Sequence, residues 1–248
     1  MHYESGASQR GQKVASGRHD LQPHFQSWKT MIKQHVNLSA ADFLPTHCDI
    51  ASLRQAAGLC RGCNLFRTAV QTVFGEGPAD ARLVFVGEQP EREDDEQGRP
   101  FVGPAGKLFR IALAEVGIDV SQIYLTNVVK HFKPAPDDTS RSAVKPAARE
   151  IRACFPWLVA ELEAIRPEMV VCLGAVASQA LLGPRFRVSK QHGEVLSTIW
   201  APWTIATYHP AAILRSPDAI RADVQQAFLA DLRRAAERLA QCSHHAPS

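Results

Sequence analysis

The stretch from Leu83 to Gly106 reads LVFVGEQPEREDDEQGRPFVGPAG. Its first four residues are an apolar run ended by Gly87, which is typical of a buried strand, and its last residues lead into a helical pattern. Between them lies an acidic segment, from Glu91 to Glu96, that we expect to be a solvated loop. The stretch therefore predicts a strand, a loop and a helix. In open α/β sheets, loops at the carboxyl ends of strands hold the ligand sites.

Downstream of this stretch, strand and helix signals alternate along the chain. This alternation predicts an α/β fold, doubly wound, with a mostly parallel central sheet flanked by helices. Short helical patterns before residue 75 predict an N-terminal helical extension. The expected strands are 83–86, 123–128, 169–173, 194–196 and 203–207, and the expected helices are 105–116, 147–165, 175–182 and 217–240.

Length and composition indicate one large domain of an ordinary globular protein. The chain has 248 residues, is 45% hydrophobic and carries a net charge of +3. We expect a domain over 51–242, preceded by an extension over 1–50 that is partly disordered, its first 18 or so residues being polar and aperiodic. An apolar run of about 18 residues is absent, which predicts no membrane contact, and the polar N-terminus indicates a cytoplasmic protein. We expect a monomer.

Three loops follow predicted strands and carry polar side chains typical of a catalytic site. They span 88–101, 127–131 and 208–215, and they include Asn127 and His209. Since the carboxyl ends of parallel strands meet at one edge of a sheet, we expect these loops to form a single crevice.

Five motifs resemble those of the uracil-DNA glycosylase superfamily, in particular its iron–sulfur branch, called family 4. They are CRGC at 60–63, GEQP at 87–90, PFVGPAG at 100–106, TNVVK at 126–130 and YHPAAILR at 208–215. The match covers roughly residues 55–240. It implies an enzyme that flips uracil out of DNA and hydrolyses the N-glycosidic bond to leave an abasic site, without a nucleotide cofactor.

The GEQP sequence and the run His131-Phe132-Lys133 resemble a sub-branch that binds uracil-DNA tightly and crosslinks to it. That sub-branch uses a His in a KRRIH loop, and the aligned position here is near Ala143. The family also has Gly where this chain has Glu91. A covalent crosslink is therefore not expected, which leaves turnover or binding without chemistry.

The resemblance and the chemistry of the reaction together assign candidate roles at the crevice. Phe101 would stack on the flipped base, and Asn127 offers an acceptor beside a donor, matching uracil N3–H and O4. His209 would stabilise the leaving uracil anion. Further candidates are Glu88 and Gln89 around the base, Asp95 for water or the cationic sugar, Glu91 as an added catalytic carboxylate, and Leu214 and Arg215 as wedge and clamp in the DNA.

A second group of residues resembles the cluster site of family 4. Cys60, Cys63 and Cys154 match three family ligands, and His131 stands at the position of the fourth. We expect a structural [4Fe–4S] cluster on these residues, since imidazole can replace one thiolate. Cys172 is an alternative fourth ligand, although its strand context predicts a buried apolar role, and zinc on the same residues stays open.

Basic residues near the crevice could follow a DNA backbone. They are Lys130, Lys133, Arg141, Lys145, Lys190 and Arg215. Uracil-containing DNA is thus the expected partner, and a uracil-DNA binding protein with little or no turnover is the main alternative to the glycosylase. A plain α/β nucleotide-binding domain with a zinc clip is a weaker alternative, because the chain has no G-x-G-x-x-G or P-loop motif.

Overall fold

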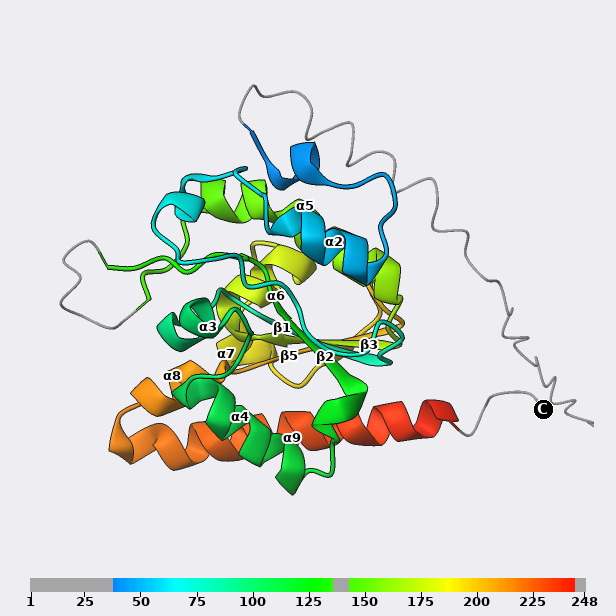
Figure 1. The fold of residues 1–248 in the computed structure, drawn as a ribbon. Coiled ribbons are helices and arrows are strands. Elements are labelled where there is room, and N and C mark those ends of the chain that lie inside the picture. Colours follow the sequence, from blue (N-terminus) through cyan, green and yellow to red (C-terminus); the bar gives the residue numbers. More distant parts are fainter. Residues whose placement is uncertain (1–37, 136–142, 244–248) are drawn as a thin grey trace, which may run out of the picture. The chain divides into compact units, whose positions relative to one another are not determined.

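The computed structural model describes residues 38–135 and 143–243. Its centre is a five-stranded sheet in the order β2-β1-β3-β5-β4 (Figure 1). Neighbouring strands are parallel except for the short β4, which runs antiparallel to β5. The predicted doubly wound, mostly parallel sheet is therefore confirmed. The strands are β1 (Leu83–Gly87), β2 (Ile123–Asn127), β3 (Met169–Leu173), β4 (Val195–Leu196) and β5 (Trp203–Thr207).

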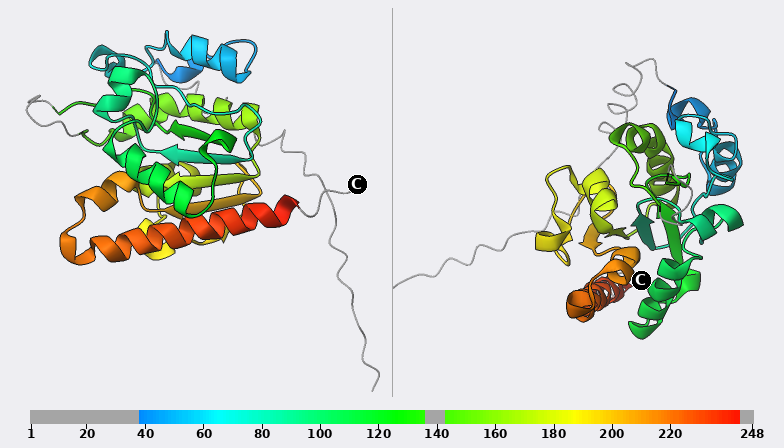
Figure 2. Two further views of the ribbon diagram at one scale, coloured as in Figure 1. Left: turned by 60° about the horizontal axis from the view of Figure 1, so that its bottom comes forward. Right: turned by 90° about the vertical axis from the view of Figure 1, so that its left-hand side faces the viewer.

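Helices cover both faces of the sheet (Figures 1 and 2). Helices α2 and α5 lie on one side, and α4 and α9 lie on the other. The helical elements are η1 (Ala40–Phe43), α2 (Ile50–Ala57), η2 (Asn64–Arg67), α3 (Arg92–Gln97), α4 (Pro104–Glu115), η3 (Val120–Gln122), α5 (Ala148–Ile165), α6 (Gly174–Leu182), α7 (Val188–Gln191), α8 (Pro210–Arg215) and α9 (Asp218–Ser243).

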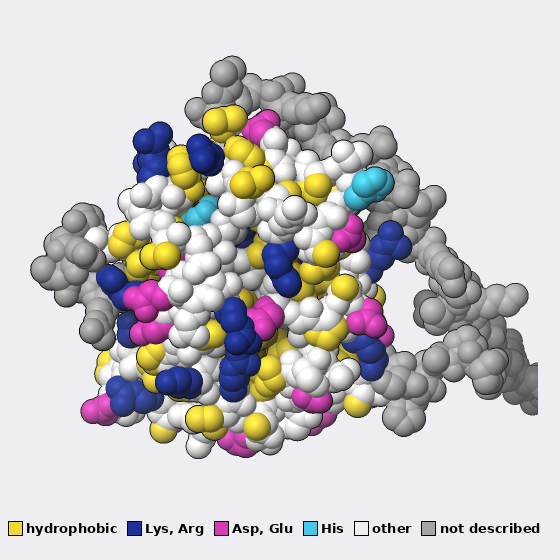
Figure 3. Space-filling view, in the orientation of Figure 1, with side chains coloured by type: hydrophobic (Ala, Val, Ile, Leu, Met, Phe, Trp, Pro, Cys, Tyr) yellow, Lys and Arg dark blue, Asp and Glu magenta, His cyan; other side chains and the backbone are white. Residues whose placement is uncertain are grey.

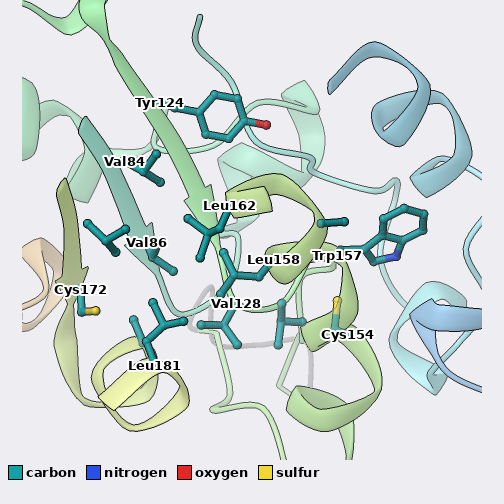
Figure 4. Close-up of a cluster of buried hydrophobic side chains, with 14 of the residues drawn as sticks. Val84, Val86, Tyr124, Val128, Cys154, Trp157, Leu158, Leu162, Cys172 and Leu181 are labelled. Atoms are coloured by element: carbon teal, nitrogen blue, oxygen red, sulfur yellow. The ribbon is translucent and has the colours of Figure 1, made fainter. Parts of the chain in front are cut away.

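The strand residues alternate between two buried clusters because successive side chains of a strand point to opposite faces. Val84 and Val86 of β1 pack toward α5 and α6 (Figure 4). Leu83 and Phe85 of the same strand pack toward α4 and α9. Both faces are covered, so these strands are continuously apolar, as is usual for parallel sheets.

Two segments expected as loops contain short helices: α3 within 88–101 and α8 within 208–215. The acidic run expected as a loop forms α3, whose start is stabilised by a hydrogen bond from the Glu91 amide to Asp94 Oδ2 at 3.1 Å. Acidic side chains suit the first turn of a helix, where the amides carry partial positive charge.

The described part of the N-terminal extension packs against the helices that follow it. Ala40, which is 1% exposed, shares a buried cluster with Ile50 of α2. The predicted disorder of the first 18 residues lies outside the described residues. Within 38–135 and 143–243, no helix combines the length and apolar character needed to cross a membrane.

Candidate functional site

The candidate crevice lies where β1, β2 and β5 end. Gly87 and Asn127 are paired in register at the ends of β1 and β2. A Cβ at Gly87 would lie 2.3 Å from Asn127 Oδ1 and 2.8 Å from Phe101 Cζ. Only glycine therefore allows the amide and the aromatic ring to approach this strand end together.

Phe101 is held in a strained backbone conformation. Its φ is +59°, which is unusual for a residue with a side chain. A Cβ at Gly106 would lie 1.8 Å from the Phe101 carbonyl oxygen, so α4 needs glycine there. The Phe101 ring is buried and nearly parallel to the His209 ring, with centroids 6.3 Å apart and an interplanar angle of 26°. Strain of this kind is common at functional sites.

Asp94 organises this turn, although sequence reasoning assigned it no role. Its Oδ1 accepts hydrogen bonds from the amides of Val102 at 2.8 Å and Gly103 at 3.4 Å. Its Oδ2 accepts from the Glu91 amide, as noted above. One buried carboxylate thus joins the start of α3 to the residues after Phe101. Its place three residues after a helix start was the available signal.

Asn127 is 2% exposed, and its side-chain oxygen is buried. This Oδ1 atom has no hydrogen-bond partner among the described residues. Buried amide oxygens are normally bonded, so an unpaired one beside an aromatic ring points to a ligand.

His209 presents a second unpaired polar atom to the same region. Its Nδ1 accepts a hydrogen bond from the Ala211 amide at 3.1 Å, which places the ring proton of the neutral form on Nε2. That Nε2 atom is buried and has no partner among the described residues. Burial, together with a smaller effect of the Arg215 charge, lowers the pKa of His209 to about 4. At neutral pH the ring is therefore an uncharged donor.

Two partly buried carboxyl groups, those of Glu88 and Glu91, interact electrostatically with nearby basic side chains. Burial raises the pKa of Glu88, while Lys145 and Arg215 oppose the rise. Burial also raises the pKa of Glu91, with contributions from Asp94 and Glu93, and Arg215 again opposes it. Arg215 thus interacts with Glu88, Glu91 and His209 from the end of α8. Its neighbour Leu214 is 41% exposed.

Asp95 and Gln89 make contacts with other loops. The Asp95 carboxylate accepts hydrogen bonds from the amides of Val70 at 2.9 Å and Gln71 at 3.3 Å. Gln89 Nε2 donates to the Val144 carbonyl at 2.9 Å, and its Oε1 is buried without a partner in the described part of the chain. Both residues hold segments around the crevice together.

The expected basic residues fall into different environments. Lys130 is fully buried, so the expectation that it follows a DNA backbone is wrong. Lys133 pairs with Glu150 at 2.8 Å. Lys145, Lys190 and Arg215 are exposed, and Arg141 lies outside the described residues. On the face in Figure 3, basic and acidic side chains are interspersed.

The structure brings the predicted cluster thiols into one neighbourhood. Burial raises the pKa of the Cys154 thiol to about 12; Lys130 opposes the rise, and Cys63 and Cys60 add to it. Burial likewise raises the pKa of Cys63, with Cys60 adding to it. Buried thiols become thiolates readily when a metal binds them.

His131 and Cys172 differ in how they relate to these thiols. His131 Nδ1 is buried without a partner in the described segments, while its Nε2 lies 3.0 Å from Thr72 Oγ1. Burial lowers the pKa of His131 to about 4, which favours the neutral, metal-binding imidazole. Cys172 lies in the core beside Leu181, apart from Cys154 (Figure 4).

Within residues 38–135 and 143–243, no group of three or more His, Cys, Asp or Glu is arranged around a single metal ion. A four-iron cluster binds one ligand at each iron, so its ligands stand further apart than those of one ion. The buried Cys60 and Cys154, the half-buried Cys63 and the His131 nitrogen without a partner are donors of the kind that such a cluster takes.

Comparison with known proteins bears on this site. The family model of the uracil DNA glycosylase superfamily matches residues 74–233. A type-4 uracil-DNA glycosylase of Archaeoglobus fulgidus is 40% identical over 165 residues, covering 64% of this chain and 79% of the relative. The type-4 enzyme of Thermotoga maritima is 38% identical over 158 residues, covering 63% and 79%.

A third relative extends the match further. The type-4 uracil-DNA glycosylase of Pyrobaculum aerophilum is 32% identical over 185 residues, covering 72% of this chain and 90% of its own length. The matched residues include the Phe101 turn, Asn127 and His209. The chain belongs to the uracil-DNA glycosylase superfamily, in its type-4 branch.

Proposed function

We propose that this protein excises uracil from DNA by hydrolysing the N-glycosidic bond, leaving an abasic site for base excision repair. The observation that carries the proposal is the pair of buried polar atoms, Asn127 Oδ1 and His209 Nε2, which lack a partner among the described residues and belong to side chains near the Phe101 ring. An acceptor and a donor beside an aromatic ring are what a flipped pyrimidine requires. The type-4 relatives support the same activity.

Uracil recognition would depend on Asn127 and Phe101. Asn127 Oδ1 would accept N3–H of uracil, and its amide nitrogen would donate to O4. Cytosine presents the opposite pattern at this edge and would leave buried groups unpaired, which costs far more than a lost contact. The Phe101 ring would stack on the base.

His209 would stabilise the leaving group. As the bond to the sugar breaks, negative charge develops on uracil O2, and the Nε2–H donor would bind it more strongly than the neutral base. The depressed pKa of His209 keeps the ring neutral, so its Nδ1 continues to accept from Ala211. The donor is therefore already oriented before the bond breaks.

The surrounding residues would bind the DNA and the cationic sugar. We assign Glu88 and Gln89 to the rim of the base pocket and Glu91 to electrostatic stabilisation of the sugar, near Arg215. Leu214 and Arg215 would enter and hold the duplex, since both are exposed at the end of α8. Asp95 would act as a positioning residue, because its oxygens already bind backbone amides.

We also propose that residues 51–242 form the glycosylase domain and that Cys60, Cys63, His131 and Cys154 hold a [4Fe–4S] cluster. Such a cluster would supply structural cross-linking. These residues would join the segment after α2 to the start of α5 and to the turn after β2. A brown protein with iron and sulfide in equal amounts is expected; a colourless zinc protein would contradict this assignment.

The function is tested with an end-labelled oligonucleotide containing one uracil. After incubation with the protein, alkali should cleave the strand at the uracil position, whereas an untreated lane stays intact. A matched oligonucleotide with thymine at that position is the control. If alkali leaves the uracil strand intact while a native gel shows a complex, the protein is a uracil-DNA binder and the proposed turnover is wrong.

A further inference from the structure

A buried lysine is bonded directly to the backbone of the base-reading residue. Lys130 is fully buried, and its Nζ donates to the Asn127 carbonyl at 2.7 Å and to Thr126 Oγ1 at 2.6 Å. Its third partner is Glu161 Oε2, from the middle of α5. All three ammonium donors are therefore used, and one of them fixes the peptide unit that follows Asn127.

Glu161 is also fully buried and fully bonded. Its Oε1 accepts from the Gly75 amide, the Tyr124 hydroxyl and Thr126 Oγ1, each at 3.0 Å. The carboxylate thus joins α5 to β2 and to the segment before β1. The ammonium of Lys130 lies over the Phe74 ring, 5.5 Å from its centroid, which completes the enclosure.

Stability alone does not account for this pair. The free energy lost by removing two charges from water is about as large as the free energy gained from their attraction. Apolar replacements of buried ion pairs are therefore often neutral or stabilising. Such a pair is useful where it orients another group. Here the oriented group is Asn127. Its main chain is fixed by Lys130, while its side-chain oxygen has no partner among the described residues.

The turn from Asn127 to Lys130 is held at a second point on α5. The Lys130 amide donates to Cys154 Sγ at 3.2 Å. Residues 154 and 161 are seven positions apart on one helix, so they lie on the same face. Helix α5 therefore fixes both the main chain and the side chain of Lys130.

We propose that the buried Lys130–Glu161 pair is the positioning device of the base-reading amide: it holds the Asn127 peptide so that the side chain faces uracil in one orientation. This inference rests on the proposed function of Asn127. It makes Lys130 and Glu161 positioning residues, which do not touch the substrate. It predicts that neutralising both preserves the fold but weakens the selection of uracil.

The test uses the double variant Lys130→Met with Glu161→Gln in the full chain. Removing both charges avoids a buried unpaired charge, and glutamine retains an acceptor for Gly75 and Tyr124. We expect a melting temperature within a few degrees of wild type and a single-turnover excision rate lower by roughly tenfold to a hundredfold. The preference for uracil- over thymine-containing oligonucleotides in binding should fall with it.

Tyr124→Phe is the matched control. The substitution removes a hydrogen bond to the same Glu161 carboxylate, and the Tyr124 hydroxyl is not bonded to Asn127. Its rate and its uracil preference should stay within about twofold of wild type, whatever its stability.

The outcomes separate this inference from the proposed function. A folded double variant that excises and prefers uracil as wild type does would overturn the positioning role. If the double variant unfolds, the single variant Thr126→Val, which removes one Lys130 partner, should lower uracil preference without unfolding; unchanged preference would likewise overturn it. If the wild-type protein binds uracil-containing DNA without excising uracil, only the proposed turnover is wrong. The positioning role is then tested by comparing the uracil-over-thymine binding preference of the variants with that of wild type.

Discussion

The ends of β2 and β5 each present one group to the crevice, but they hold it in different ways. Asn127 is the last residue of the buried strand β2, and its carbonyl accepts a hydrogen bond from the fully buried Lys130 ammonium. His209 starts the six-residue helix α8 and is oriented by one backbone amide, and the helix ends at the exposed Leu214 and Arg215. The β2 end, proposed to read the base, is built as part of the core, whereas the β5 end, proposed to stabilise the leaving group, belongs to the surface that would meet DNA.

The largest expected effect is at the β5 end. His209→Ala removes the donor that would face the uracil anion, and the single-turnover rate should fall by roughly 10²–10³-fold, as when one oxyanion donor is lost. The measurement is the rate of alkali-sensitive product with enzyme in excess. His192→Ala is the control. The His192 ring lies near Tyr208, but its Nδ1 is hydrogen-bonded to Asp231 Oδ2 at 2.9 Å, so its loss should leave the rate within a few fold of wild type. Equal losses in both variants would contradict the role of His209.

The next effect tests how tightly the β2 end is packed. Gly87→Ala would place a methyl group 2.3 Å from Asn127 Oδ1 and 2.8 Å from the Phe101 ring. A shift of about 1 Å in a reacting group can cost roughly 10²-fold in rate, so a loss of that order is expected. Gly58→Ala, whose new Cβ would lie 3.4 Å from the nearest atom, is the control and should retain activity. A fully active Gly87→Ala would show that the crevice is not as close-packed as its geometry indicates.

Acid pH should affect the β5 end through His209, while Glu88 and Glu91, whose pKa values are raised by burial, also take up protons in acid. The pKa of His209 is about 4 in the folded chain and about 6.5 unfolded, so the unfolded chain binds the extra proton first. The stability that comes from the neutral ring is complete above pH 6.5 and is lost as pH falls toward 4. Below about pH 4, Nδ1 is protonated and can no longer accept from Ala211, so the rate should fall by about tenfold per pH unit.

Arg215→Gln sharpens this pH test. The Arg215 charge is one cause of the depressed His209 pKa, so the variant should shift the acid inflection of the rate toward higher pH. A pH–rate profile under single-turnover conditions measures the shift. An inflection that does not move would mean that burial alone sets the His209 pKa.

The fold was predictable because its signals are local. Apolar strands such as Met169–Leu173 and the helical pattern of α4 are complete within a dozen residues, and both were located correctly to within about a residue. The acidic segment was expected to be a loop because it lacks the periodic apolar residues that predict a helix. Its helix is stabilised by a side chain that bonds its own first turn, Asp94, rather than by an apolar face.

The crevice was predictable only in part because its supporting contacts are distant in sequence. Asn127 and His209 were predicted from motifs at the ends of strands, and the structure places both side chains near Phe101. Lys130 was expected at the surface, since nothing near it in sequence reveals Glu161, 31 positions away on α5. Motifs predict which residues lie at the crevice, whereas the residues that hold them in place depend on the packing of whole elements.

The smallest expected effect concerns the loop after β1, a third strand end beside those of β2 and β5. Glu91→Gln removes a charge but keeps the shape of a side chain that lies near Arg215 and the start of α4. If the carboxylate stabilises a cationic sugar through partly solvated space, its loss should lower the rate by roughly tenfold, or about 1.4 kcal/mol. Glu93→Gln, in the same acidic segment, is the control and should retain the wild-type rate. Because the neighbouring amides and Arg215 still hold glutamine in place, an unchanged rate in Glu91→Gln would assign Glu91 to loop structure, leaving the β2 and β5 ends as the two catalytic contributors.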